Sequence, residues 1–292
     1  MKKELKHWIS VAWPEWSDQK WPIFFKEEEN KIKKVLHSNQ LYNGKETEYL
    51  EKEFSKYNKS KYVKVVGNAT QGLHLALAAL DIGAGDEVIV TNYSWISTAS
   101  CILMQNAIPV FVDIEPRYLS IDIEQIEKKI NSKTKAIIYV HLYGFISNAS
   151  RLVRLAKKYN LKLVEDASHA PGASYKNKKA GNFGDIAVLS MQQRKNLCCG
   201  DGAIIVCKNK KLSKKIYQLR SFGSKELSYN YRISELAAGI ARVRLKRLDK
   251  ENKKRNEIVK KIESKLSKLE GILTLKPMEN TYPVYYKLIF FY

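Results

Sequence analysis

A lysine interrupts two apolar stretches in the segment LSMQQRKNLCCGDGAIIV. This residue, Lys195, follows one apolar run and precedes a Gly-Asp-Gly turn that leads into a second run. Such a position gives the lysine no evident role in packing. If the amine were desolvated and surrounded by groups that bind an aldehyde, it could form a Schiff base. The segment therefore indicates covalent chemistry through this amine.

Other polar and aromatic residues also follow apolar runs. In GNATQGLHLAL, Ala69 and Thr70 stand where a loop enters a helix, so backbone N–H groups and a hydroxyl could bind a phosphate, although Thr70 could also be an ordinary N-cap. Trp95 could offer an aromatic face to a flat ligand or belong to the core. Asp166 could hold a protonated ring nitrogen or cap the next segment. His169 could contact a phenolic oxygen or be a core histidine with its hydrogen bonds satisfied. Together with the lysine, these groups suggest pyridoxal phosphate.

Such residues meet only if a sheet brings the ends of its strands together, because ligands of open parallel sheets bind at the carboxyl ends. Short β-branched runs alternate with helical stretches from Val63 onward, which predicts an α/β fold with a mostly parallel, seven-stranded sheet covered by helices. The predicted strands are residues 62–66, 87–91, 108–114, 135–141, 162–167, 185–190 and 202–207. The predicted helices between them are residues 70–83, 94–107, 122–130 and 149–160.

The flanking segments predict helices before the sheet and a second unit after it. Amphipathic patterns at 27–39 and 46–58 indicate two helices joined at an Asn-Gly turn. A helical tract follows at 230–269, with a break expected near Asp249–Asn252, and residues 282–292 read as a strand. We expect residues 1–245 to form an N-terminal segment and a large cofactor-binding domain. Residues 246–292 would begin a small C-terminal domain that is incomplete.

Composition narrows the class of protein. The chain of 292 residues carries a net charge of +21, which could indicate a nucleic-acid partner. Its lysines are spread along the chain, however, and the densest block, from Lys246, has apolar residues at helical spacing. We therefore expect a solvated helix face, no nucleic-acid partner, and attraction of anionic small substrates. No run of apolar residues suits a membrane span or a signal peptide, and the four cysteines form no CxxC pair, which favours a cytoplasmic protein without a disulfide framework or a metal site.

Several long stretches resemble the DegT/DnrJ/EryC1/StrS family of sugar aminotransferases, in family order and at family spacing. They include ATQGLHLALAALDIGAGDEVIVTNYSW, LVEDASHAPGASYKNKKAGNFGDIAVLSMQQRKNL and NYRISELAAGIARVRL. The resemblance implies a fold-type I enzyme dependent on pyridoxal 5'-phosphate, in which Lys195 binds the cofactor and moves protons. Asp166 would pair with the ring nitrogen, Trp95 would stack on the ring, and His169 would lie near the ring oxygen.

The resemblance also implies how the phosphate is held and what reacts. Ala69, Thr70 and Ser190 would bind the phosphate, and Asn230 would reach the phosphate of a neighbouring subunit, so that a homodimer shares its active sites. The enzyme would move an amino group from glutamate or glutamine to a keto-sugar: a nucleotide sugar, a keto-octulosonate or a cyclitol. Cell-surface polysaccharide or lipopolysaccharide biosynthesis is the implied setting. The abrupt end of the chain leaves an alternative, a truncated or non-catalytic relative that binds the cofactor without turnover.

Overall fold

Seven strands form the central sheet of the computed structural model, which describes residues 22–222 and 228–292. Six of the seven lie within the predicted ranges, and β6 begins one residue before its range; their order across the sheet is β1-β11-β10-β7-β6-β2-β3. Their bounds are β1 Tyr62–Val66, β2 Glu87–Thr91, β3 Ile108–Val112, β6 Thr134–Val140, β7 Lys162–Asp166, β10 Ile186–Ser190 and β11 Ala203–Cys207. The predicted α/β fold with a mostly parallel sheet is confirmed.

Strand direction gathers the strand ends at one edge. Neighbouring strands pair in parallel from β10 through β7, β6 and β2 to β3, whereas β11 runs antiparallel to both β1 and β10. In this register Asp166, the last residue of β7, lies beside Val140 of β6 and Val188 of β10. The loops that follow β1, β2, β6, β7 and β10 therefore open toward a shared region.

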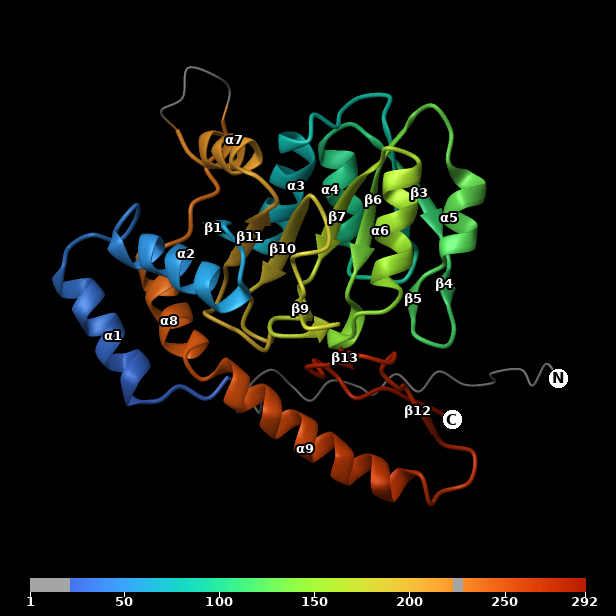
Figure 1. Cartoon of the computed structure of the whole chain (residues 1–292). Helices are drawn as coiled ribbons and strands as arrows, with labels where there is room; N and C mark the ends of the chain where they lie inside the picture. Colours follow the sequence, from blue (N-terminus) through green and yellow to red (C-terminus); the bar gives the residue numbers. More distant parts are fainter. Residues whose placement is uncertain (1–21, 223–227) are drawn as a thin grey trace.

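Helices cover both faces of the sheet, and Figure 1 views it from the side on which α2 and α6 lie in front of the strands. Side chains alternate along each strand, so Val65 packs in the cluster of one face and Val66 in that of the other. One layer consists of α3 Ala69–Ala79, α4 Ser97–Met104 and α7 Lys210–Arg220. The other consists of α2 Lys45–Asn58, α5 Ile123–Lys129, α6 Ala149–Lys158 and α8 Glu235–Leu245.

The helical tract after Arg220 breaks earlier than predicted. Helix α8 ends at Leu245 and α9 runs from Leu248 to Leu266, so the break falls at residues 246–247 rather than near Asp249–Asn252. Asp249 instead lies in the first turn of α9, where negative charge is favourable because the N-terminal end of a helix is positive. Helix α1 Lys26–His37 packs against α8. Within the described residues, the structure contains no helix with the length and apolarity needed to cross a membrane.

The prediction of one strand over residues 282–292 is wrong. Only its ends pair: β13 Thr281–Tyr282 joins β8 Ser174–Tyr175, and β14 Phe290–Phe291 joins β12 Leu273–Thr274. Between them, Pro283 has no N–H to donate to a ladder, and the backbone N–H groups of Val284 and Tyr286 bond to the carbonyls of Gly144 and Tyr143 at 3.1 and 2.9 Å. The segment therefore lies along the loop after β6. The remaining short strands are β4 Ile114–Glu115, β5 Ser120–Ile121 and β9 Lys178–Lys179. The division of the chain at residue 245 into two domains stays a prediction.

Candidate active site

A cavity of about 840 Å³ opens at the carboxyl ends of the parallel strands. Seven of the eight residues predicted to bind a cofactor line it: Ala69, Thr70, Trp95, Asp166, His169, Ser190 and Lys195. The eighth, Asn230, lies outside this lining, and its side-chain oxygen accepts hydrogen bonds of 3.1 and 3.0 Å from Arg232. A residue that serves a neighbouring subunit would lie outside the cavity of its own chain. That role of Asn230 stays a prediction.

The amine of Lys195 lies inside the cavity, 4.6 Å from the centre of the Tyr286 ring. Its loop is fixed by backbone hydrogen bonds: Lys195 donates to Gln192 at 2.8 Å, and Met191 donates to Gly202 at 2.7 Å. Burial lowers the pKa of Lys195 from 10.5 to about 8; Asp166 opposes this change and Lys287 adds to it. The side chain is thus a desolvated amine, and in a fraction of the molecules it is neutral and nucleophilic near neutral pH.

Asp166 ends β7 at the floor of the cavity and is only 5% exposed. The hydroxyl of Thr98 donates to one carboxylate oxygen at 2.8 Å, and the backbone N–H of Ser168 donates to the other at 3.2 Å. These bonds fix the orientation of a buried carboxylate. The alternative role for Asp166, a cap of the next segment, agrees with the Ser168 bond but does not explain the bond from Thr98. A fixed negative charge in this position suits a protonated ring nitrogen.

Two helices begin at the cavity wall. Asn68, not Thr70, caps α3, because its side-chain oxygen accepts the N–H of Gln71 at 2.9 Å; the reading of Thr70 as the N-cap is wrong. The Thr70 hydroxyl instead lies 2.7 Å from the hydroxyl of Ser97, the first residue of α4. Helix N-termini favour anions through their free N–H groups and their dipole. With the buried hydroxyl of Ser190 in the same lining, this wall suits a phosphate.

His169 is held between two aromatic rings. It stacks on Tyr286, with ring centres 4.1 Å apart, and lies parallel to Tyr143 at 6.2 Å. Burial, then Lys195 and Lys287, lower its pKa to about 2, so the imidazole is neutral. Its Nδ1 accepts the backbone N–H of Tyr143 at 3.3 Å, which leaves the ring proton on Nε2. The ring can therefore donate one hydrogen bond to a ligand oxygen.

Trp95 is 71% exposed, so the reading of it as a core residue is wrong. It stands just before α4 in the lining of the cavity, where it offers a free aromatic face to a flat ligand. The indole lacks the packing that would explain it as a structural residue.

The cavity residues that come from the C-terminal segment were not predicted from the sequence. Tyr286 and Lys287 lie in the lining although they are more than ninety positions beyond Lys195. The aromatic run YPVYYKLIFFY contains them, but its composition predicts a strand and not a cavity wall. Arg194 also lines the cavity, and its place directly before Lys195 could have singled it out. Gln71 reaches the lining with a buried side-chain oxygen that has no hydrogen-bond partner among the described residues.

The arrangement fits pyridoxal phosphate group by group. A desolvated amine suits an aldehyde, a buried carboxylate suits a protonated ring nitrogen, and two helix N-termini suit a phosphate. A neutral histidine with its proton on Nε2 suits a phenolic oxygen, and an exposed indole suits the face of the ring. These complementary groups come from the ends of four strands, β1, β2, β7 and β10, that are distant in sequence.

Comparison with known proteins agrees with this chemistry. Residues 22–291 match the family model of the DegT/DnrJ/EryC1/StrS aminotransferase family. An uncharacterised protein of Methanocaldococcus jannaschii, MJ1066, is 35% identical over 271 residues, which cover 87% of this chain and 70% of that protein. GDP-perosamine synthase of Caulobacter vibrioides is 36% identical over 232 residues, 77% of this chain and 62% of that protein. Among solved structures, DesV of S. venezuelae superposes with a TM-score of 0.86 at 33% identity, over 89% of this chain and 72% of that one.

Proposed function

We propose that this chain, which belongs to the DegT/DnrJ/EryC1/StrS aminotransferase family, moves an amino group from glutamate or glutamine to the keto group of a nucleotide sugar. The family consists of sugar aminotransferases that depend on pyridoxal phosphate. Relatives named GDP-perosamine synthase support a nucleotide sugar over a keto-octulosonate or a cyclitol. The observation that carries the proposal is the desolvated amine of Lys195 in one cavity with the fixed carboxylate of Asp166.

Each residue of the cavity has a role in the proposal. Lys195 would hold the cofactor through its amine and would move protons to and from the reacting carbon. Asp166 keeps the ring nitrogen protonated, and Trp95 covers the ring. His169 donates from Nε2 to the ring oxygen. Pyridoxal phosphate, when bound, carries the amino group between donor and acceptor and delocalises the electrons released from the substrate carbon.

The remaining assignments concern the phosphate and the assembly. Ala69, Thr70 and Ser190 bind the phosphate from their own subunit, and Asn230 binds the phosphate of the neighbouring subunit in a cytoplasmic homodimer. The buried side-chain oxygen of Gln71 cannot accept a hydrogen bond from an ionised phosphate; it suits a donor on the substrate. A role in biosynthesis of cell-surface polysaccharide, such as lipopolysaccharide, agrees with an amino sugar product.

Borohydride reduction tests the covalent step. The protein loaded with pyridoxal phosphate is reduced and digested, and the pyridoxyl group should map to the peptide that contains Lys195. Lys195→Ala should abolish the label, while Lys253→Ala, on the exposed side of α9, should keep it. A label on another lysine would refute the assignment. Amino transfer from glutamate and glutamine to a panel of keto-sugars then tests turnover, and a labelled protein without turnover would favour a non-catalytic relative.

A further inference from the structure

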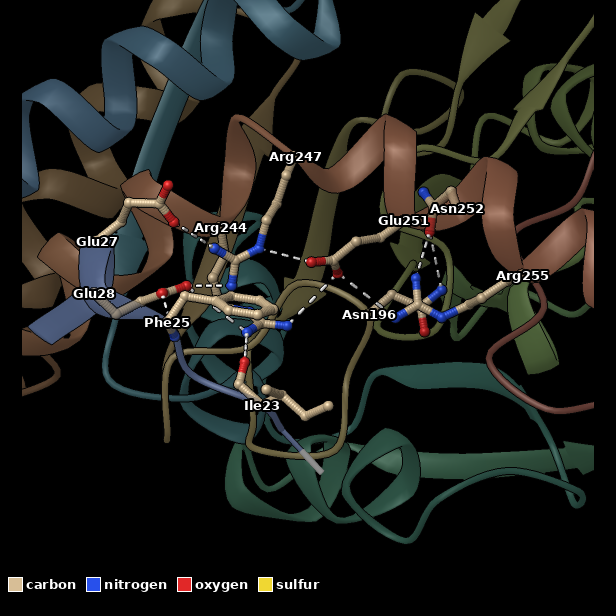
Figure 2. A network of polar contacts seen from close by, with 10 residues as sticks. All are labelled: Ile23, Phe25, Glu27, Glu28, Asn196, Arg244, Arg247, Glu251, Asn252 and Arg255. Atoms are coloured by element: carbon tan, nitrogen blue, oxygen red, sulfur yellow. Dashed lines mark hydrogen bonds and ion pairs between the residues drawn. The ribbon is translucent and has the colours of Figure 1, made fainter. Parts of the chain in front are cut away.

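Asn196, the residue directly after Lys195, connects three parts of the protein. It is only 5% exposed, and its amide nitrogen carries two hydrogens to donate. That nitrogen donates to the backbone carbonyl of Val284 at 2.9 Å and to the side-chain oxygen of Asn252, in α9, at 3.4 Å; Figure 2 shows the second of these bonds. Asn196 thus ties the loop of the lysine both to α9 and to the segment that carries Tyr286.

The partner of this amide on α9 is itself held in place. Asn252 is fully buried, its amide donates to the Pro171 carbonyl at 3.0 Å, and its side-chain oxygen also accepts from Arg255 at 3.1 Å. Arg255 lies 3.8 Å from Glu251, which pairs with Arg247 at 2.7 Å (Figure 2). Asn252 therefore presents its oxygen to the lysine loop from a fixed position.

The segment of residues 284–286 belongs to no strand, so its position depends on single hydrogen bonds. The backbone N–H of Val284 donates to Gly144 at 3.1 Å, and that of Tyr286 donates to Tyr143 at 2.9 Å. Val284 is fully buried, and its carbonyl accepts the bond from Asn196. A buried carbonyl that loses a donor is costly, so loss of this bond would favour movement of the segment toward water.

The aromatic ring two residues beyond Val284 lies against the reactive amine. The Tyr286 ring stacks on His169, with ring centres 4.1 Å apart, and its centre lies 4.6 Å from the Lys195 amine. Burial is the largest cause that lowers the pKa of Lys195 to about 8. The bond from Asn196 to Val284 therefore helps to set how closely this ring covers the amine.

We propose that Asn196 is a positioning residue: by joining the lysine loop to Val284 and Asn252, it keeps the Tyr286 ring beside the Lys195 amine. The inference rests on the proposed function, in which that amine binds the cofactor. Asn196 is not part of the lining of the large cavity, so it acts through its neighbours. A serine offers one donor and an ionised aspartate none, whereas an amide supplies both bonds.

Reductive methylation of the full chain, freed of its cofactor, tests the inference. Formaldehyde and cyanoborohydride are applied over a pH series, and mass spectrometry follows the peptide that contains Lys195. Asn196→Leu keeps the approximate size of the side chain and removes both donors. We expect the midpoint of the Lys195 rate to rise by about 1 pH unit, a tenfold decrease in the ratio of neutral to charged amine, because water reaches the amine.

The substitution changes no charge, so a higher midpoint reports access of water. The other carboxylates and basic side chains that line the cavity remain as they are: Asp166, His169, Arg194, Asp201 and Lys287. An unchanged midpoint in Asn196→Leu overturns the inference. If this variant does not fold, Asn196→Ala takes its place, since its smaller side chain leaves room for a water molecule at the Val284 carbonyl. The same rise is expected there, and its absence is equally decisive.

Asn58 provides a matched control. It is 1% exposed, and its amide donates to the side-chain oxygen of Ser60 at 2.9 Å and to the Ala180 carbonyl at 3.2 Å, the same pattern as in Asn196. It ends α2 and does not line the cavity. Asn58→Leu should lower the thermal unfolding temperature but keep the wild-type midpoint. An equal rise of the midpoint in this control would overturn the inference, because general loosening would then explain it.

A double variant tests whether Asn196 acts through the ring. Tyr286→Ala by itself removes the cover of the Lys195 amine and should raise the midpoint. Asn196→Leu, added to Tyr286→Ala, should then raise it by less than about a third of its effect in the wild-type chain, because residues that act through one another are not additive. Fully additive shifts would show that Asn196 acts by another route and would overturn the inference.

The inference and the proposed function fail in different ways. If borohydride does not fix the cofactor on Lys195, the proposed function is wrong whatever the methylation midpoints are. If it does, and the midpoint of Lys195 is the same in the Asn196 variant as in the wild-type chain, the inference is wrong while the aminotransferase assignment stands.

Discussion

The amine of Lys195 should react with aldehydes at a pH at which an ordinary lysine is almost fully charged. Burial lowers its pKa from 10.5 to about 8, against the opposing effect of Asp166. A pKa lower by about 2.5 raises the ratio of neutral to charged amine about 300-fold at any pH below both values. At about pH 7.5, roughly a quarter of the Lys195 amines would be neutral, compared with about 0.1% at the ordinary value.

Residue-resolved reductive methylation measures this difference. Protein freed of its cofactor is treated with formaldehyde and cyanoborohydride over a pH series, and mass spectrometry follows the peptide that contains Lys195. The midpoint of its rate against pH should lie near 8. Asp166→Asn should move the midpoint lower, because it removes the charge that raises the pKa and preserves a polar group for the bond from Thr98. The exposed Lys253 in the same digest serves as the reference.

The same argument predicts a stability change with a definite sign. Because the folded-state pKa of Lys195 is lowered, unfolding takes up protons between about pH 8 and 10.5, and stability rises with pH in that window. Lys195→Met should therefore stabilise the cofactor-free protein below about pH 8, by up to about 3 kcal/mol, and the gain should vanish as the pH approaches 10.5. A methylation midpoint no lower than that of Lys253, or a variant that is less stable at neutral pH, would refute the desolvated amine.

Three further predictions follow from particular contacts. His169 should show no titration between about pH 5 and pH 8 in an NMR experiment, since burial and two lysines lower its pKa to about 2; a midpoint in this range would contradict the stacked, buried ring. Asn252→Ala should lower the free energy of unfolding, measured by urea denaturation, by about 2–4 kcal/mol, because it leaves buried polar groups without partners. Lys253→Ala, on the exposed side of α9, should change this free energy little. Gly172→Ala should destabilise the protein more than Gly85→Ala does. Both glycines have positive φ, but of the two only Gly172 would bring the new Cβ within 2.7 Å of other side chains. Equal decreases in the thermal unfolding temperature of the two variants would show that the collision is relieved.

The strands and the residues that follow them were predictable because an apolar run, and the polar residues directly after it, can be recognised within a short stretch of sequence. Short, continuous runs of apolar and β-branched residues mark buried strands, and the topology of a parallel sheet sends the next residues to one edge. Lys195, Asp166 and Thr70 could therefore be grouped without knowing which strands are neighbours. Which residue caps a helix depends on the exact residue at which the helix begins. Asn68 and Thr70 are both suitable N-cap residues, and only the helix start at Ala69 decides between them.

The contacts that support the site from a distance were not predictable. Asn196 meets Asn252 across 56 positions of sequence and Val284 across 88. No pattern in either segment indicates the other. The aromatic run after residue 281 has the composition of a strand, yet Pro283 and hydrogen bonds to the loop after β6 place it outside any ladder. Tertiary contacts there override the local preference.

The segment of residues 284–286 links three features of the site that otherwise come from separate strands. Its backbone bonds to residues 143 and 144, its Val284 carbonyl accepts from the residue after the lysine, and its Tyr286 ring stacks on His169 beside the Lys195 amine. Because the Tyr286 ring lines the cavity, stacks on His169 and lies 4.6 Å from the Lys195 amine, a shift of this segment would change the desolvation of the amine and of the imidazole together. Coupling of this kind means that Tyr286→Ala should raise the methylation midpoint of Lys195 and the pKa of His169 together, because burial is the main cause that lowers both values.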